Sequence, residues 1–297
     1  MAESPREQLP EPRGWPWGAM LTAAIALMFV LAAGFVQFKP NLFQHLFGDI
    51  LPPPRVTLQE AYEEKPGGPS FDHSALDRLL KAHVDQEGWV DYQGLKADAA
   101  ELNGYIQAIA RASFDEMGRK QKLALLINAY NAFTLRLILD YYPVASIKDI
   151  PEDKRWNDER WHVGGHQWSL LQIENEEIRP KFIEPRLHFA LVCAAIGCPK
   201  LRNEAYQADR LEQQLEDQAR LVHSHRRWFR FDPGDGILHL TQLYLWYSDD
   251  FAQVAASVPA FAARYAPDLK KELDQGRQFR IKWLGYDWRL NSKENRP

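Results

Sequence analysis

Cysteine is the residue in shortest supply, since the 297 residues contain only two, Cys193 and Cys198. Two cysteines are too few for the disulfide framework that holds many small secreted domains together. Both lie in the apolar segment HFALVCAAIGCP, residues 188–199, which also contains His188. Covalent chemistry that requires sulfur is therefore confined to this segment.

A large excess of charge of either sign is also missing. The formal net charge is −4 and the sequence pI is about 6.2, whereas binding to a nucleic-acid backbone needs a clustered basic face. The sequence contains no glycine-rich phosphate loop, dinucleotide-binding fingerprint or nucleophile elbow. We therefore expect no nucleic-acid partner and no cofactor.

Metal-binding motifs are absent from the sequence as well. His162 and His166 are four residues apart, which is the spacing of two ligands on one helical face. Gly164 and Gly165 between them argue against a helix, and no HExxH pattern occurs. We expect no metal site.

Charge is most completely lacking near the N-terminus. Residues 19–36 (AMLTAAIALMFVLAAGFV) carry none, and residues 18–38 are long enough to cross a bilayer as a helix. Trp15, Trp17 and Lys39 stand where interfacial anchors are usual. The sequence thus predicts a short tail (1–17) and a membrane anchor (18–38), so that the protein contacts a membrane through its N-terminal helix.

A cleaved signal peptide is the alternative interpretation of this segment. Ala32, Ala33 and Gly34 suit a signal peptidase, but acidic residues outnumber basic ones before the apolar run, and the run exceeds a usual signal core. We therefore favour an uncleaved single-pass anchor in the inner membrane with a periplasmic domain; export after cleavage ranks second. Basic residues are too evenly distributed to set the orientation.

The rest of the chain predicts a stalk and one folded domain. Residues 39–69 are rich in proline and glycine, which suits a semi-rigid stalk, and residues 70–291 form the domain, followed by a tail (292–297). Helices are predicted at 71–84, 102–112, 119–142, 170–178 and 207–222, and strands at 89–92, 188–194, 228–231, 237–240 and 279–283. The class is α+β, with the apolar helix 119–142 buried centrally on a small mixed or antiparallel sheet.

Several segments of this domain resemble a bacterial family known as domain of unknown function 547. They occur in the family's order and are INAYNAFTL (127–135), YPVASIKDI (142–150), LLQIENEEIRP (170–180), PRLHFALVCAAIGCPKL (185–201), WYSDDF (246–251) and YDWRLN (286–291). Leu126 departs from the pattern, because the resemblance leads us to expect tryptophan before INAYN. The resemblance implies a membrane-tethered or exported bacterial protein and no established activity.

Cys193 is the candidate nucleophile. A thiol becomes reactive when a nearby imidazolium, another cation or a helix N-terminus lowers its pKa from about 8.5. If residues 188–194 are a strand, His188 and Cys193 point to opposite faces because their offset is odd. The base would then come from elsewhere, and His162 and His166 are the first choices. The competing interpretations are a buried, inert Cys193 and a Cys193–Cys198 disulfide.

Three polar residues lie on the apolar helix and one carboxylate lies on a mostly apolar turn. Asn128 and Asn131 share a helix face with Tyr130 beside them, and they either tie loops to the helix or bind a ligand. Glu174 either pairs with Arg179 or Arg186, which we favour, or orients a catalytic histidine.

Two functions follow. The first, which we favour slightly, is an envelope module that binds a small molecule or a protein in a polar cleft around Cys193, His188, Asn128 and Asn131. The second is a cysteine-dependent hydrolase or transferase in which Cys193 performs acyl-transfer chemistry with His188, His162 or His166 as base and Glu174 as orienting residue.

Overall fold

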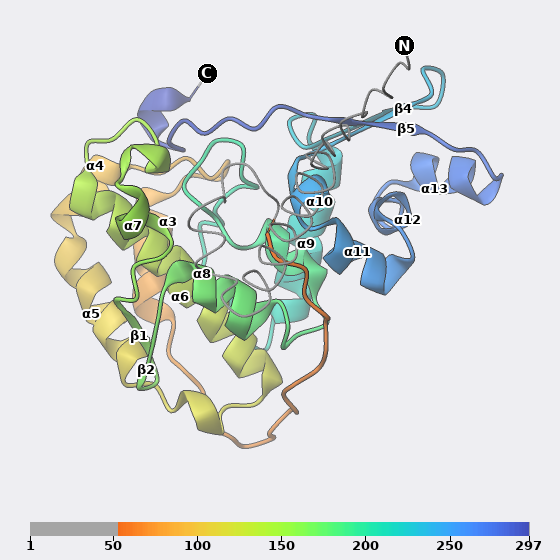
Figure 1. Ribbon diagram of the computed structural model, residues 1–297. Helices are drawn as coiled ribbons and strands as arrows, with labels where there is room; N and C mark the ends of the chain where they lie inside the picture. The colour runs from red at the N-terminus through yellow and green to blue at the C-terminus, as the bar shows by residue number, and fades with distance from the viewer. Residues whose placement is uncertain (1–52, 297) are drawn as a thin grey trace, which may run out of the picture. The chain divides into compact units, whose positions relative to one another are not determined.

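The computed structural model describes residues 53–296. Most of its regular structure is helical (Figure 1). The α-helices are α3 (Ser74–His83), α4 (Tyr92–Ala97), α5 (Ala99–Ala110), α6 (Arg119–Tyr141), α7 (Glu152–Arg155), α8 (Leu170–Gln172), α9 (Leu211–Ser224), α10 (Leu243–Trp246), α11 (Ser248–Ala255), α12 (Val258–Ala262) and α13 (Pro267–Asp274).

Shorter helices and strands complete the described chain. A π-helix, Ile173–Ile178, continues α8, and short 3-10 helices span Phe114–Glu116, Ile147–Asp149, Pro185–Phe189 and Lys293–Asn295. The strands are β1 (Trp161–Val163), β2 (His166–Trp168), β3 (Phe229–Asp232), β4 (Ile237–Leu240) and β5 (Arg280–Trp283). β1 and β2 form an antiparallel hairpin, while β3 is antiparallel and β5 parallel to β4 in a mixed sheet.

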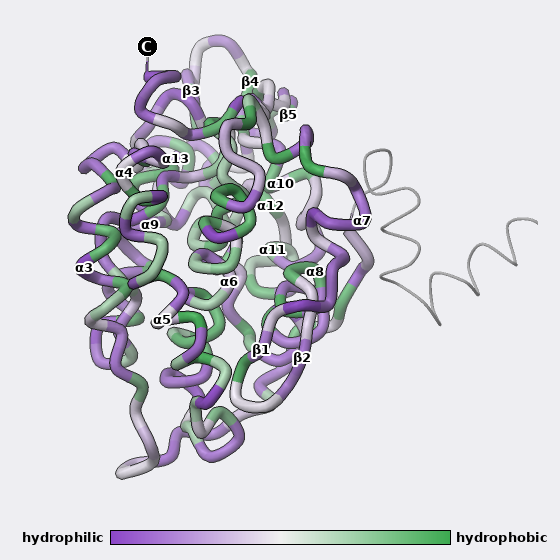
Figure 2. Tube along the Cα trace, turned by 90° about the vertical axis from the view of Figure 1, so that its left-hand side faces the viewer, coloured by the Kyte–Doolittle hydropathy of each residue, from purple (hydrophilic) through white to green (hydrophobic). Residues whose placement is uncertain are grey.

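The predicted central helix is confirmed as α6. It buries seventeen of its 23 residues, and in Figure 2 its trace is largely hydrophobic while more polar segments surround it. The helix begins after Gly118 and ends before Tyr142 and Pro143, because a residue before proline disfavours the helical conformation. α6 packs chiefly against α5 and the π-helix rather than on a sheet.

Two hydrophobic clusters make up the core. One surrounds α6 and takes in side chains of α3, α5 and α9, among them Leu76, Tyr105 and Leu215. The other lies under the mixed sheet and α11, and includes Phe251 and Phe261. The segment with both cysteines runs beside both clusters, since Phe189 belongs to the second and Ala190 to Leu201 contribute to the first.

The α+β class is confirmed, and so are the β3–β4 hairpin and the closing strand β5. The strand expected at residues 188–194 is wrong. Pro185–Phe189 is a 3-10 helix and the chain after it is irregular. An apolar run forms a strand only when a neighbouring strand pairs with its backbone, and here helices and side chains satisfy that backbone instead. The strand expected at residues 89–92 is also wrong, because Val90 makes isolated bridges to Val84 and Ser292 and Tyr92 begins α4.

The predicted membrane anchor, residues 18–38, and the first part of the stalk lie outside the described residues. Within residues 53–296, α6 alone is long and apolar enough to span a membrane, and 89% of that apolar window is buried inside the fold.

Burial of His73 and His223 gives the fold a predictable pH dependence. Burial lowers the pKa of each from 6.5 to about 4, so the unfolded chain binds these protons first as the pH falls below 6.5. Stability is therefore lost between pH 6.5 and 4. Urea unfolding should give a free energy about 4 kcal/mol lower at pH 5 than at pH 7.

The variant His223→Gln tests the cause. In the native protein, Nδ1 of His223 donates to the Ala219 carbonyl and Nε2 meets the Tyr244 hydroxyl at 2.7 Å. Glutamine does not titrate, so the loss between pH 7 and pH 5 should shrink by about half. An unchanged pH dependence in this variant would contradict the assignment.

Candidate functional site

A cavity of about 640 Å³ brings together most of the reactive side chains of the described chain. Cys193 and Cys198 line it together with His188, Glu174 and Tyr130. Its remaining walls come from α10 and the start of α11, the segment before α3, and the C-terminal segment around Tyr286. Residues as far apart in the sequence as Pro53 and Trp288 thus share one pocket.

Backbone hydrogen bonds hold the cysteine segment in place on both sides. Asn131 of α6 donates from Nδ2 to the Ala190 carbonyl (3.0 Å) and accepts at Oδ1 from the Val192 amide (2.9 Å). On the other side, Ile196 donates its amide to Arg289 (2.9 Å) and Gly197 donates to Asp287 (2.8 Å). These contacts replace the strand pairing that the sequence suggested.

The turn between the two cysteines has little steric freedom. Ala194 has a φ of 61°, which is uncommon for a residue other than glycine. A Cβ at Gly197 would lie 2.8 Å from the backbone nitrogen of Asp287, so this close approach requires glycine. The Trp228 indole donates to the Gly197 carbonyl at 3.0 Å. The turn therefore holds the two sulfurs together.

The two cysteines are free thiols in contact with each other. Their Sγ atoms are 2.7 Å apart, whereas a disulfide bond measures about 2.05 Å. The Tyr286 hydroxyl lies 3.1 Å from Cys193 Sγ and 2.9 Å from Cys198 Sγ. The Cys193 amide donates to Cys198 Sγ at 3.2 Å. Cys198 is 5% exposed, and Cys193 is the more accessible thiol.

This arrangement makes the two thiols unequal. The hydrogen bond to Cys198, together with burial, raises the pKa of Cys193 well above its usual value. Burial acts to raise the pKa of Cys198 too, but the hydrogen bonds from Cys193, Tyr286 and backbone amides outweigh it and lower that pKa. A negative charge in the pair therefore resides on Cys198, where the donors converge.

A buried ion pair lies behind His188. Nε2 of His188 is 2.8 Å from Oδ2 of Asp250, and the Arg179 guanidinium binds the same carboxylate through Nε (2.8 Å) and a terminal nitrogen (3.0 Å). Burial lowers the pKa of His188 despite its contact with Asp250. Burial therefore disfavours the charged imidazole, and Asp250 holds the ring through Nε2.

Glu174 is held by tyrosines. Its carboxylate accepts from the Tyr247 hydroxyl at 2.5 Å and from the Tyr130 hydroxyl at 3.3 Å. The Tyr247 ring also stacks on His188, with centroids 3.7 Å apart. The favoured pairing of Glu174 with Arg179 or Arg186 is therefore wrong: Arg179 binds Asp250 and Asn175, whereas Arg186 binds three other glutamates.

Aromatic side chains form another wall of the pocket. Trp246 packs against Tyr286 (centroids 4.8 Å apart) and Trp288 (6.1 Å), and Trp156 reaches Trp288 at 6.2 Å. The Lys148 ammonium lies 4.3 Å from the centre of the Trp288 ring. Because Tyr286 also touches both sulfurs, a molecule that binds to this wall lies next to the thiol pair.

Several predicted site residues do not line the pocket. The side-chain amide of Asn128 donates to the Tyr206 carbonyl (2.8 Å) and accepts from the Tyr206 amide (2.9 Å). Asn131 binds the cysteine segment in the same way, so both asparagines tie loops to α6. His162 is exposed on β1, and His166 pairs with Asp115 at 3.0 Å. Of the predicted histidine bases, the structure brings His188 alone to the cavity that Cys193 lines.

His188 and Cys193 were expected to point to opposite faces of a strand at residues 188–194, and this expectation is wrong because that strand does not form. Because residues 188–193 do not form a strand, the odd offset does not separate the two side chains. No histidine of residues 53–296 is hydrogen-bonded to either sulfur, although both His188 and the sulfurs face the cavity. Within the same residues, no group of three or more His, Cys, Asp or Glu side chains is placed to hold a metal ion.

Residues 114–221 match the model of a family described as "Protein of unknown function, DUF547". The matched DUF547 segment comprises 108 of the 297 residues. No curated protein and no solved structure matches the chain. The resemblance to DUF547 is thus confirmed, and the matched DUF547 residues contain Glu174, His188 and both cysteines.

Four site residues that follow the matched DUF547 segment were not predicted from the sequence. Tyr247, Tyr286 and Trp288 line the pocket, and Asp250 binds His188 from behind it. Asp250 and Tyr247 lie in WYSDDF, and Tyr286 and Trp288 lie in YDWRLN. These two motifs carried part of the resemblance to DUF547, and both are dense in aromatic and acidic residues. That density was the available signal, but only the folded chain places both motifs beside the cysteines.

Two neighbouring aspartates allow a matched test of the buried ion pair. Asp250→Asn leaves the Arg179 charge buried without its carboxylate, which should lower the free energy of unfolding by about 3–5 kcal/mol. Asp249→Asn removes a partly exposed partner of Arg55 and should lower it by about 0–1 kcal/mol. Urea unfolding at pH 7 measures both, and equal losses would contradict this account of the site.

Proposed function

We propose that this protein is a membrane-anchored thiol–disulfide oxidoreductase whose Cys193–Cys198 pair exchanges with disulfides bound in the aromatic-walled pocket. The observation that carries the proposal is the contact between two free thiols, 2.7 Å apart, at the edge of a substrate-sized cavity. A disulfide forms from this pair with a small movement, because the sulfurs already lie on one tight turn.

The polar partners of the sulfurs favour this chemistry over acyl transfer. A cysteine hydrolase requires a base within hydrogen-bond reach of its nucleophile. Here each sulfur is instead hydrogen-bonded to the other sulfur and to the Tyr286 hydroxyl. In a dithiol the second sulfur takes the place of the histidine, because it accepts the proton of the first.

The reaction balances without a cofactor. The pair starts with Cys193 as thiol and Cys198 as thiolate. Cys193 passes its proton to the Cys198 thiolate and attacks one sulfur of the substrate disulfide, which releases the first substrate thiolate. Cys198 gives this proton to the released thiolate, attacks Cys193 Sγ, closes the Cys193–Cys198 bond and releases the second substrate sulfur as a thiolate. The substrate therefore leaves as one thiol and one thiolate, the single negative charge is conserved, and the pair is oxidised by two electrons.

Acyl transfer by Cys193 is the second candidate, favoured by the position of His188 on the same cavity. His188 is oriented by Asp250 through Nε2. In this candidate, binding of a thioester substrate brings Cys193 and the His188 imidazole together. The two candidates differ in whether Cys198 is needed.

The predicted anchor at residues 18–38 and the periplasmic placement belong to the same proposal. The bacterial periplasm supports disulfide chemistry, whereas the cytosol keeps most thiols reduced. A tethered oxidoreductase would act on proteins or small disulfides near the membrane surface.

Oxidised glutathione is a direct probe of the thiol pair. The reduced protein should form the intramolecular disulfide, whereas Cys198→Ser should accumulate glutathione on Cys193 because no second sulfur resolves the adduct. Cys193→Ser should react at least about tenfold more slowly, since the remaining thiol is buried. Intact-mass measurement distinguishes the products. If neither adduct nor disulfide forms, the oxidoreductase proposal is wrong; thioester hydrolysis that survives Cys198→Ser would favour acyl transfer.

Tyr286→Phe tests the role of the hydroxyl. A hydrogen bond to a charged group contributes about 1.5–3 kcal/mol, so its loss should raise the pKa of Cys198 by about one to two pH units. The pH dependence of alkylation by iodoacetamide in the Cys193→Ser background measures this shift. Tyr247→Phe is the matched control, because it removes a tyrosine hydroxyl from the same pocket that binds Glu174 and not sulfur. Equal shifts in both variants would contradict the assignment.

A further inference from the structure

The segment that precedes α3 crosses the surface of the domain and reaches the thiol pocket. Residues 53–63 contain no helix or strand, yet they contact α6, α11 and the loop after the π-helix. We call residues 53–63 the strap. Pro53 and Arg55, at one end of the strap, line the pocket. The strength of its contacts differs greatly from one end to the other.

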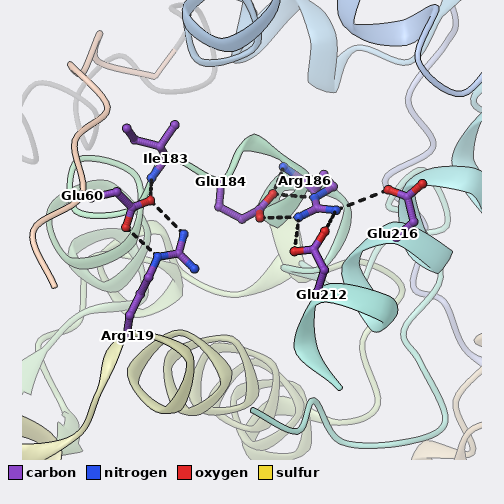
Figure 3. A network of polar contacts seen from close by, with 7 residues as sticks. All are labelled: Glu60, Arg119, Ile183, Glu184, Arg186, Glu212 and Glu216. Carbon is purple, nitrogen blue, oxygen red and sulfur yellow. Dashed lines mark hydrogen bonds and ion pairs between the residues drawn. The ribbon is translucent and has the colours of Figure 1, made fainter. Parts of the chain in front are cut away.

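The far end of the strap is anchored by Glu60. Its carboxylate binds the Arg119 guanidinium through both oxygens, at 2.6 and 2.8 Å, and also accepts from the Ile183 amide at 2.9 Å. Figure 3 shows this cluster beside a second one, in which Arg186 binds Glu184, Glu212 and Glu216. Two-oxygen contacts of this kind fix geometry as well as distance.

Neighbouring contacts strengthen the same anchor. Ala61 donates its amide to the Lys181 carbonyl at 3.1 Å, and Arg119 donates its amide to the Glu63 carbonyl at 2.9 Å. The Tyr62 ring packs on Phe182 with centroids 5.3 Å apart. Residues 60–63 are thus part of the packed domain.

The middle of the strap is held by one side chain of α11. Gln253 accepts from the Leu58 amide and donates to the Val56 carbonyl, both at 2.9 Å. One amide therefore binds the backbone on both sides of Thr57. It is the last backbone clamp that the described structure provides before the pocket.

The pocket end has a much weaker hold. Arg55 pairs with Asp249 at 2.8 Å, but their side chains are 89% and 42% exposed. Ion pairs this exposed contribute little to stability, since water and salt screen them. Asp249 itself lines the pocket. The pocket end can therefore detach while the Glu60 anchor stays in place.

We propose that residues 53–55 form a lid over the thiol pocket, hinged at the Gln253 clamp and latched by the Arg55–Asp249 ion pair. This inference rests on the proposed function, because it regulates the access of a disulfide substrate to Cys193. Opening breaks the latch and removes Pro53 and Arg55 from the pocket wall, whereas the Glu60 anchor keeps the strap attached.

The experiment compares the rates at which two reagents label Cys193 in the reduced full-length protein at pH 8.5. Iodoacetamide is small, and a maleimide on a bulky polymer is large. Each rate is divided by the wild-type rate for the same reagent, so that any change in thiolate fraction cancels in the bulky-to-small ratio. Arg55→Ala should raise this ratio about two- to fivefold, and Arg55→Lys should restore most of the wild-type value.

Salt and a matched variant serve as controls. With the rates of the wild type at low salt as the reference, high salt should raise the bulky-to-small ratio of the wild type but not that of Arg55→Ala, because it screens the same exposed ion pair. Arg78→Ala removes a comparably exposed pair, Arg78–Glu101 at 2.8 Å, that does not line the pocket, and it should leave the ratio unchanged.

The lid proposal is overturned if Arg55→Ala leaves the ratio at its wild-type value, if Arg78→Ala raises it equally, or if neither reagent labels Cys193 in either protein. These outcomes do not depend on the proposed function. Alkylation reports access to a thiol, whereas failure of exchange with oxidised glutathione would refute the oxidoreductase and leave the alkylation result intact.

Discussion

The guanidinium of Arg179 is 1% exposed and belongs to the largest fully buried side chains of the described residues. A charge that is buried so completely must be compensated by hydrogen-bonded partners. Asp250 of α11 supplies the carboxylate and Asn175 of the π-helix supplies an amide oxygen. Since the same carboxylate binds His188, this one requirement joins three separate segments, and those segments form the back of the pocket.

The backbone around the two cysteines is irregular and buried. A polar backbone that leaves regular structure inside a protein needs other partners for its amides and carbonyls. Asn131 supplies them from α6, and residues 287–291 supply them from the end of the chain. The turn can therefore hold two sulfurs in contact, because it is constrained from both sides and packed around Gly197.

The functional proposal depends on how polar groups are divided between the two sulfurs and His188. The sulfurs and His188 line the same cavity. Tyr286 and a backbone amide form hydrogen bonds with the sulfurs, whereas Asp250 and Tyr247 hold the imidazole. The site is thus two adjacent polar systems that share an aromatic wall. A disulfide substrate needs mainly the first system, and the second can contact whatever group that substrate carries. The strap adds a contact from the opposite end of the domain, firm at Glu60 and weak at Arg55.

Local sequence determined the parts of this protein in which neighbouring residues decide the structure. The uninterrupted apolar pattern that ends before Pro143 predicted α6 almost to its boundaries, and the DPGDG turn predicted the β3–β4 hairpin. The sequence also confines both cysteines to residues 188–199, and it offered loop-tying as one of two roles for Asn128 and Asn131, which their backbone contacts support. Tertiary structure decided the backbone conformation at Cys193. Whether this segment forms a strand or an irregular loop depends on which groups form hydrogen bonds with its backbone. Asp250, Tyr247 and Tyr286 complete the site and lie 49 or more positions after Cys198. No periodicity in the sequence encodes a contact over that distance.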